Sequence, residues 1–497
     1  MTRPALRLAA CLALGLTVPV ASPASDASRP NLIVINIDDL GYAETGPFGG
    51  ANRTPHLDRM AREGRKLNSH YAAPVCSPSR AALMTGSYAK RALPIPHVLF
   101  PVAEVGLNPG ERTIAEVLRD AGYATACVGK WHLGDQRDFL PTRQGFDSFF
   151  GIPYSNDMGL AAEGARSNRG APPPAAKQKA KAAAAQAAAD PATGLRGNAQ
   201  PPLPLLENET VVGRVREAEQ IDLTRRYTER AVQFIRDRRD RPFFLYLAHS
   251  AVHFPVYPRD EFMGKSGRGL LGDWVQEVDW SVGQVLDALR ALQLDGRTLV
   301  IFTSDNGGPV NQGATNGPLR GSKGTTFEGG MRVCTLAWWP GRIPAGTATE
   351  AITSMMDVLP TFARLGGATL PADRKLDGVD IWPVLAGDPA TPPRDQMLYF
   401  RGLTLEAVRS GPWKLHLAGG ELYDVAKDLG ESWNVAAQHA DVVRRLRAIA
   451  DATKGDLDPD GVGPGCRPLG RVPNPQPLLA LDGTVRADAV GKTKRFP

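Results

Sequence analysis

Three stretches of the chain are largely apolar, and each is followed at once by polar residues. They are residues 31–37, 241–248 and 297–303. Apolar and polar positions do not alternate within them, which is typical of parallel strands that are buried on both faces. Patterns with helical spacing separate these runs, at residues 113–121, 224–238 and 274–292. The succession of strands and helices predicts an α/β fold whose sheet carries helices on both faces.

The pattern changes towards the C-terminus. Short strand candidates with tight turns between them lie at residues 397–400, 406–409 and 413–417, and a helical pattern covers 442–450. Local turns imply an antiparallel sheet. We therefore predict a main domain over residues 28–390, a smaller antiparallel sheet with one helix over 391–455, and an extended tail rich in Pro and Gly over 456–497.

Two further stretches do not fit a folded domain. Residues 1–27 start with Arg3 and Arg7, continue as a short apolar run and end in small residues, which is typical of a secretory signal peptide. Residues 161–205 are rich in Ala, Lys, Pro and Gly, so we expect a disordered insertion there. No other segment approaches membrane-spanning length. We therefore expect a secreted or periplasmic protein with no stable membrane span.

The composition is that of an ordinary globular protein. Of the 497 residues, 42% are hydrophobic and 22% charged, and the formal net charge is +6. No basic stripe is interleaved with aromatic residues, so we do not expect nucleic acid as a partner. Cys127 and Cys334 lie in apolar runs typical of buried thiols, and we expect at most one disulfide among these two and Cys466.

Polar side chains follow two of the predicted strands directly. Asp38 and Asp39 come after the first apolar run, and Asp305 and Asn306 come after the third. A single Asp-Asp pair is often only a turn or a helix cap, but two such pairs at equivalent strand ends favour a shared site. Oxygen ligands without His or thiolate prefer Ca²⁺ or Mg²⁺ to zinc.

Residues 74–86 combine a cysteine with the signals of a helix start. Pro78 has a preset φ and lacks an N–H, so it fits the first turn of a helix. Cys76 would then lie at the helix N-terminus, where free N–H groups and the helix dipole favour an anion. An isolated cysteine is more often a buried structural thiol. The fixed spacing of Pro78 and Arg80 after Cys76 instead favours a chemical role.

A second dense motif, residues 122–134, runs from a strand into a loop that ends in a cation and an imidazole. His132 offers a general base there, and Lys130 offers a partner for an anionic oxygen. His253 and Lys323 add a second candidate acid and another cation. An isolated lysine is more often a solvated surface residue, so these assignments depend on the surrounding motifs.

Together, these motifs resemble the type I, formylglycine-dependent sulfatase family, and within it the arylsulfatase A-like members. Both family signatures match, around Cys76 and at residues 129–132. Further matches lie at residues 38–39, 145–147, 151–155, 304–307, 321–324, 328–330, 408–415 and 421–424. The resemblance covers about residues 30 to 435 apart from the insertion. Asn156 and Phe327 replace the more usual His and Trp, which bears on the leaving group and not on the sulfur chemistry.

The resemblance implies an alkaline-phosphatase-like fold with a large mixed sheet, and a hydrolase of aryl or carbohydrate sulfate monoesters. Cys76 would be oxidised to formylglycine by a formylglycine-generating enzyme. The hydrated aldehyde would attack sulfur and pass through a covalent sulfate hemiacetal. The implied ligands of a bound Ca²⁺, with Mg²⁺ as the alternative, are Asp38, Asp39, Asp305, Asn306 and the modified Cys76.

The resemblance also implies roles for the remaining site residues. Arg80 and Lys130 would stabilise the attacking oxygen. Sulfate would be contacted by Lys130, His253 and Lys323, with Ser155 beside the substrate. Either His253 or Lys323 would protonate the leaving alcohol, and His132 would drive the release of sulfate from residue 76.

Two other functions remain open. A phosphomonoester or phosphonate monoester hydrolase shares the fold, and the relative turnover of matched sulfate and phosphate esters would distinguish it. A secreted carbohydrate-binding protein that never acquires formylglycine is the second, and the joint presence of Cys76, Arg80 and His132 argues against it. The sequence does not identify the sulfated partner, which is a small molecule or a glycan.

Overall fold

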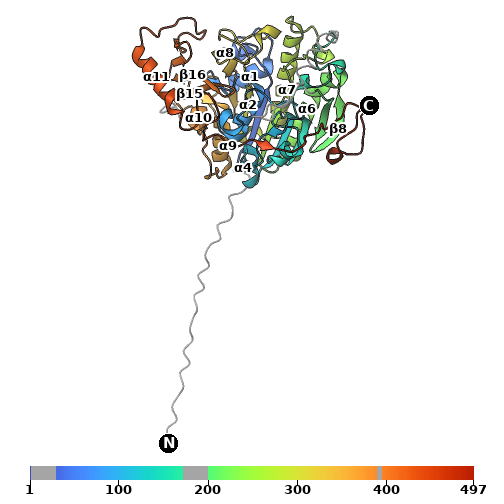
Figure 1. Ribbon diagram of the computed structural model, residues 1–497. Coiled ribbons are helices and arrows are strands. Elements are labelled where there is room, and N and C mark those ends of the chain that lie inside the picture. Colours follow the sequence, from blue (N-terminus) through green and yellow to red (C-terminus); the bar gives the residue numbers. More distant parts are fainter. Residues whose placement is uncertain (2–28, 172–199, 389–393, 497) are drawn as a thin grey trace.

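A computed structural model describes residue 1 and residues 29–171, 200–388 and 394–496. The predicted signal peptide and the middle of the predicted insertion lie outside the described residues. The folded part has a large central sheet with helices on both faces, and the C-terminal sheet lies to one side of it (Figure 1).

The central sheet contains ten strands among the described residues, in the order β13-β2-β12-β10-β1-β9-β5-β6-β7-β8. In chain order they are β1 (Asn31–Ile37), β2 (Arg65–Leu67), β5 (Ala124–Lys130), β6 (Ser148–Ile152), β7 (Leu203–Glu207), β8 (Thr210–Val215), β9 (Phe243–Ala248), β10 (Thr298–Ser304), β12 (Leu336–Trp338) and β13 (Thr347–Thr349). The five strands from β10 to β6 are parallel, whereas β12 and β7 run antiparallel to their inner neighbours. The predicted large mixed sheet is therefore confirmed.

Helices cover both faces of this sheet. They are α1 (Pro55–Glu63), α2 (Cys76–Thr85), α4 (Ile114–Asp120), α6 (Glu217–Asp237), α7 (Gly269–Ala291), α9 (Val358–Gly366) and α10 (Trp382–Ala386), whereas the short helices α3 (Ala89–Ala92) and α8 (Glu328–Met331) lie outside the cores on these two faces. In β1, Leu32 and Val34 belong to the core under α2, α4 and α9, and Ile33 and Ile35 belong to the core under α1, α6 and α7. Burial on both faces explains why this strand is apolar at nearly every position.

Helix α4 begins with a reciprocal cap. The Thr113 hydroxyl accepts the Glu116 N–H at 3.2 Å, and the Glu116 carboxylate accepts the Thr113 N–H at 2.8 Å. We expect Thr113→Ala to lower the free energy of unfolding by about 1 kcal/mol, because it leaves a helical N–H without its partner. Urea unfolding would measure this change. Thr347→Ala, a strand-edge threonine whose hydroxyl bonds only to the nearby Pro344 carbonyl, serves as the control. An equal loss in both variants would contradict the capping role.

The C-terminal elements also agree with the sequence prediction. Strands β15 (Gln396–Arg401), β16 (Thr404–Ser410), β17 (Trp413–His416) and β18 (Leu422–Asp424) form one antiparallel sheet, and α11 (Ala440–Ala452) packs against it. The tail returns to the main domain, where β19 (Gly470–Arg471) pairs with β4 (Val105–Gly106). A three-stranded sheet is formed by β11 (Arg332–Val333), β3 (His70–Tyr71) and β14 (Thr353–Ser354).

A buried ionic network joins the C-terminal sheet to the main domain. The Lys414 ammonium of β17 lies 3.0 Å from Glu328 of α8 and 2.9 Å from Glu431, and all three side chains have no exposed surface. The hydroxyls of Tyr71 and Tyr399 donate to the Glu328 carboxylate at 2.6 and 3.0 Å. Each charge in this network therefore has a partner of opposite sign, as buried charges require.

The edges of the predicted insertion need correction. Residues 161–163 form a short 3₁₀ helix, and β7 already begins at Leu203. Asn168 and Arg169 hold a neighbouring loop: the Asn168 side chain accepts the Val256 N–H at 2.9 Å, and Arg169 donates to the Pro258 carbonyl at 2.6 Å. The compositional bias hid these contacts because they use single polar side chains and no apolar face.

The predicted thiols are present. Cys76, Cys127 and Cys334 are free and buried, and Cys466 is free and partly exposed. Among the described residues, no helix is both long and apolar enough to span a bilayer.

Candidate active site

Cys76 is the first residue of α2. Pro78 lies in the first turn, and the helix ends at Gly86, whose φ of 62° suits a residue without a side chain. Cys76 is 2% exposed, and its Sγ lies 3.5 Å from Asp38 Oδ1. Burial raises the pKa of the Cys76 thiol well above its usual value, although Lys130 and Lys323 oppose the shift. The unmodified side chain is therefore a neutral thiol and a poor nucleophile.

Two neighbouring strands bring the predicted oxygen ligands together. The last residues of β1 and β10, Ile37 and Ser304, are paired in parallel register. The pairs that follow these strands therefore meet at one edge of the sheet. Asn306 Nδ2 donates to Asp39 Oδ1 at 2.7 Å, and the Asp39 N–H donates to Asp305 Oδ1 at 3.2 Å.

The donor set around Cys76 fits a divalent cation. Ligand atoms of Asp38, Asp39, Cys76 and His253 lie within 4.8 Å of one another, and all four residues are buried. Asn306 Oδ1 is buried and has no hydrogen-bond partner. Burial and the neighbouring Asp38 raise the pKa of Asp305 to about 7 although Arg80 and Lys130 oppose the shift, so further positive charge would favour the ionised carboxylate. A hard cation would supply that charge, and the unpaired amide oxygen of Asn306 would coordinate it.

Three cations surround the carboxylates. Lys130, at the end of β5, contacts Asp38 and lies 3.0 Å from Ser155 Oγ. Arg80 of α2 donates to Asp305 at 2.8 Å, and Lys323 lies 2.7 Å from Asp39. The side chains of Arg80 and Lys130 are at most 1% exposed, whereas that of Lys323 is 21% exposed. The site therefore opens to solvent on the side of Lys323.

His132 lies in the same region with its ring fixed by the backbone. Its Nε2 is 2.9 Å from the Leu99 carbonyl, and its Nδ1 has no partner among the described atoms. Burial, together with the charges of Lys130 and Arg80, lowers the pKa of His132 well below its usual value. The imidazole is therefore neutral and able to accept a proton at Nδ1.

Comparisons with known proteins now decide the family. The sulfatase family model matches residues 30–368. Human arylsulfatase A is 38% identical over 494 residues, which covers 90% of this chain and 90% of the relative. Canine N-acetylgalactosamine-6-sulfatase is 38% identical over 432 residues and covers 82% of this chain and 75% of the relative. The chain belongs to the sulfatase family.

The solved structures agree with this assignment. The PsFucS1 sulfatase from Pseudoalteromonas sp. matches with a TM-score of 0.76 and 25% identity, over 90% of this sulfatase and 93% of that chain. The Ps i-CgsB structure in complex with k-i-k-neocarrahexaose gives a TM-score of 0.72 and 30% identity, over 86% and 93% of the two chains. The named curated relatives are sulfuric ester hydrolases, and the fold is the alkaline-phosphatase-like one that the sequence predicted.

The sulfatase places His253 closer to the carboxylates than its sequence position suggests. Its Nε2 lies 3.6 Å from Asp39 Oδ2, and its side chain is 10% exposed. It comes from a loop after β9, five residues beyond the strand end, so no strand register could have predicted this contact. His249, which matched no motif, lies in the core with its ring 2.9 Å from Ser281 Oγ.

Asn156 makes contacts beside the site that the sequence did not show. It is fully buried, and its side-chain amide donates to the backbone carbonyls of His253 at 3.5 Å and Pro255 at 3.2 Å. Asn156 therefore holds the loop that presents His253.

We expect Asn156→Ala to lower kcat/KM for an aryl sulfate about tenfold and stability by about 1–3 kcal/mol, because buried carbonyls lose their donor. Steady-state kinetics and thermal unfolding would measure both effects. Thr228→Ala, a buried substitution in α6 that removes a hydroxyl bonded to Thr224 O at 2.7 Å, is the matched control. A loss of stability without a change in kcat/KM for Asn156→Ala would contradict the positioning role.

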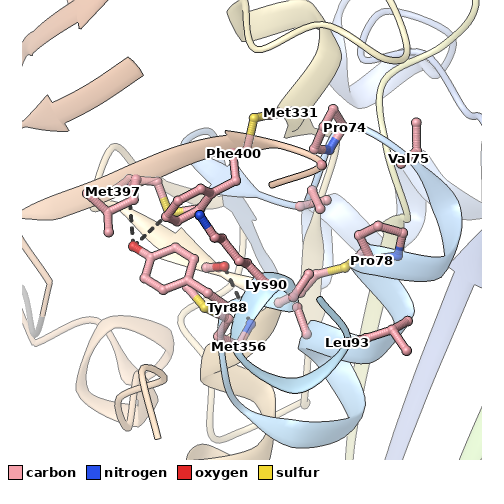
Figure 2. A pocket seen from close by; sticks show the side chains of 18 of the residues that line it. Pro74, Val75, Pro78, Tyr88, Lys90, Leu93, Met331, Met356, Met397 and Phe400 are labelled. Atoms are coloured by element: carbon pink, nitrogen blue, oxygen red, sulfur yellow. Dashed lines mark hydrogen bonds between the residues drawn. The ribbon is translucent and has the colours of Figure 1, made fainter. Parts of the chain in front are cut away.

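The back of α2 is apolar and separate from the polar site. A narrow cavity of about 40 Å³ lies between this helix and the C-terminal sheet. Figure 2 shows Pro74, Val75 and Pro78 on one side of it, with Met397 and Phe400 on the other. The small volume and mainly apolar lining of this cavity do not suit an anionic sulfate group.

Proposed function

We propose that this sulfatase is exported, to the periplasm or the exterior, and hydrolyses aryl or carbohydrate sulfate monoesters through a formylglycine made from Cys76, by way of a covalent sulfate hemiacetal. The observation that carries the proposal is the position of Cys76. It starts α2 within a cluster of three buried carboxylates and three cations, and Lys323 and His253 are the partly exposed side chains of this cluster.

Asp38, Asp39, Asp305 and Asn306 would hold the metal ion, together with the modified residue 76. We propose Ca²⁺, with Mg²⁺ as the alternative, since Asp38, Asp39, Asp305 and Asn306 offer oxygen ligands. A bound divalent cation supplies Lewis-acid polarisation of a sulfate oxygen and lowers the pKa of a coordinated hydroxyl. Arg80 holds Asp305 in place through two hydrogen bonds, at 2.8 and 3.1 Å.

Residue 76 would carry the nucleophile. A formylglycine supplies a hydrated aldehyde with two hydroxyls. One would attack sulfur, and the other would later expel sulfate. The chain's own groups prepare this position: Lys130 lies between Asp38 and Ser155, and the N-terminus of α2 favours negative charge. His132 Nδ1, neutral and without a partner, is the candidate for accepting the proton that frees sulfate.

The sulfate group would bind at the open side of the cluster. Lys130 and Lys323 supply positive charge, and Ser155 and His253 supply hydrogen bonds. Lys323 and His253 are also the two groups that reach towards solvent, so one of them would protonate the leaving alcohol. A sulfate ester carries one negative charge and no proton, which suits a site lined by cations at its mouth.

The proposal also implies a partner during maturation. Cys76 is 2% exposed at the start of a helix whose residues are all buried. A formylglycine-generating enzyme would therefore have to reach this cysteine before the chain folds.

A substrate panel tests the proposal. Enzyme with converted residue 76 would be assayed with 4-nitrophenyl sulfate, N-acetylgalactosamine 6-sulfate and 4-nitrophenyl phosphate. We expect kcat/KM for the sulfate esters to exceed that for the phosphate by about a hundredfold, because the dianionic ester adds charge without an added cation. Preferred hydrolysis of the phosphate would favour the phosphomonoester hydrolase, and binding of sugar sulfates without turnover would favour the carbohydrate-binding protein.

A further inference from the structure

A loop between α3 and β4 crosses the catalytic elements with its middle projecting outwards. Leu93, Ile95, Val98 and Leu99 are buried, but the two residues at the centre, Pro96 and His97, are exposed. An exposed histidine flanked on both sides by buried apolar residues is held at a fixed place on the surface. No hydrogen bond or ion pair to the His97 ring occurs among the described residues, so its two nitrogens are available.

Leu99 holds this loop against the start of α2 and against His132. Its N–H donates to Ser77 Oγ at 3.1 Å, next to Cys76 at the start of α2. Its carbonyl lies 2.9 Å from Nε2 of His132. The loop therefore lies across the elements that carry residue 76 and the candidate base, and His97 is only two residues away from this double anchor.

The C-terminal sheet supports the loop from the other side. Gly402, in the turn between β15 and β16, comes so close to Pro96 that a Cβ there would lie 2.3 Å from the Pro96 carbonyl oxygen. Contacts on both sides leave the backbone at residues 96 and 97 little freedom. A side chain on such a backbone can select among ligands, because little conformational entropy is lost on binding.

The contacts of Leu99 with Ser77 and His132 place His97 beside the catalytic elements. Partial burial lowers the pKa of His97, and the positive charge of Lys323 lowers it further. Lys323 is the cation at the open side of the cluster. A neutral imidazole has one donor and one acceptor, which matches the hydrogen-bonding capacity of an uncharged hydroxyl.

We propose that His97 is a specificity-determining residue, whose imidazole hydrogen-bonds to a hydroxyl on the alcohol part of a sulfated sugar bound at the mouth of the site. This inference rests on the proposed sulfatase function and narrows it towards carbohydrate sulfates. A simple aryl sulfate has no hydroxyl to offer at this position. His97 thus favours carbohydrate sulfates over aryl sulfates, whereas the cluster around Cys76 binds the sulfate group that both classes share.

The first test is kinetic. In converted enzyme, His97→Ala is expected to lower the ratio of kcat/KM for N-acetylgalactosamine 6-sulfate to kcat/KM for 4-nitrophenyl sulfate about tenfold, mainly through KM. His97→Gln, which keeps a donor and an acceptor, should restore part of the ratio. Pro96→Ala changes the other exposed residue at the centre of the loop but keeps the carbonyl that lies against Gly402, so the ratio should change much less. An unchanged ratio in His97→Ala, or an equal fall in Pro96→Ala, would overturn the inference.

The second test does not depend on turnover. Protein whose Cys76 is unconverted would be titrated with N-acetylgalactosamine 6-sulfate by isothermal calorimetry, with and without His97→Ala. We expect about tenfold weaker binding by the variant. Equal affinities, or no binding by either protein, would overturn the inference. If the binding difference is present but converted wild-type enzyme releases no sulfate, the proposed function fails and the inference stands.

Discussion

Protein whose residue 76 remains a cysteine is expected to hydrolyse sulfate esters at least about a thousandfold more slowly than converted protein, as for loss of a nucleophile. Burial keeps the Cys76 thiol protonated. A thiol that did attack sulfur would form an adduct with no second hydroxyl to expel sulfate, so turnover would stop. Activity should therefore rise in proportion to the fraction of chains that carry formylglycine.

This expectation can be measured on one preparation series. The protein would be produced with and without a formylglycine-generating enzyme, and the peptide containing residue 76 would be weighed. Conversion removes about 18 Da, the difference between the thiol and the aldehyde. Cys76→Ala should be inactive in both hosts, and Cys334→Ala, another free buried thiol, should follow the wild type. Full activity with an unmodified Cys76 would refute the mechanism.

Removal of the Asp305 carboxylate is expected to abolish metal binding and to lower kcat/KM about a thousandfold. The carboxylate lies at the end of β10 beside Asp39 and belongs to the proposed ligand set. Asp305→Ala would also remove the nearest carboxylate partner of the buried Arg80 and leave only the more distant Asp38 and the Lys130 carbonyl, which costs up to about 3–5 kcal/mol of stability. Asp305→Asn keeps the shape of the side chain and separates the loss of metal from the loss of folding.

Metal content by plasma mass spectrometry and activity on 4-nitrophenyl sulfate would be compared between the variants. Asp279→Asn is the matched control. Asp279 is a buried carboxylate that accepts the Leu57 N–H at 2.8 Å at the start of α1, and it does not belong to the proposed ligand set. It should lose stability but keep its metal. Stoichiometric zinc, or full activity in metal-free protein, would disprove the Ca²⁺ assignment.

The strand ends of the site could be predicted from sequence because their pattern is local. An apolar run buried on both faces, followed by Asp38 or by Asp305, marks the carboxyl end of a parallel strand. The register of β1 with β10 then brings both polar pairs to one place. The same reasoning found β5 and Lys130, and the short turns predicted the antiparallel C-terminal sheet.

The loops could not be predicted in the same way, because their contacts join residues far apart in the chain. Asn156 reaches the carbonyls of a loop about a hundred residues later, and Asn168 holds the same loop from within a stretch that composition assigned to an insertion. His97 owes its position to Leu99 and to Gly402. Single polar side chains create these contacts, and they leave no periodic signal in the sequence.

The ionic network of Glu328, Lys414 and Glu431 bears on how the molecule comes apart. Separating the C-terminal sheet from the main domain would break the contact of Lys414 with Glu328 and expose the aromatic surface where Tyr71 packs against Tyr399. The two sheets are therefore separate in topology on either side of residue 390, but we expect them to unfold together. Heating should therefore produce one calorimetric transition for both sheets. A chain truncated at residue 390 would lack Lys414, whose ammonium pairs with Glu328 at the start of α8, five residues after Lys323.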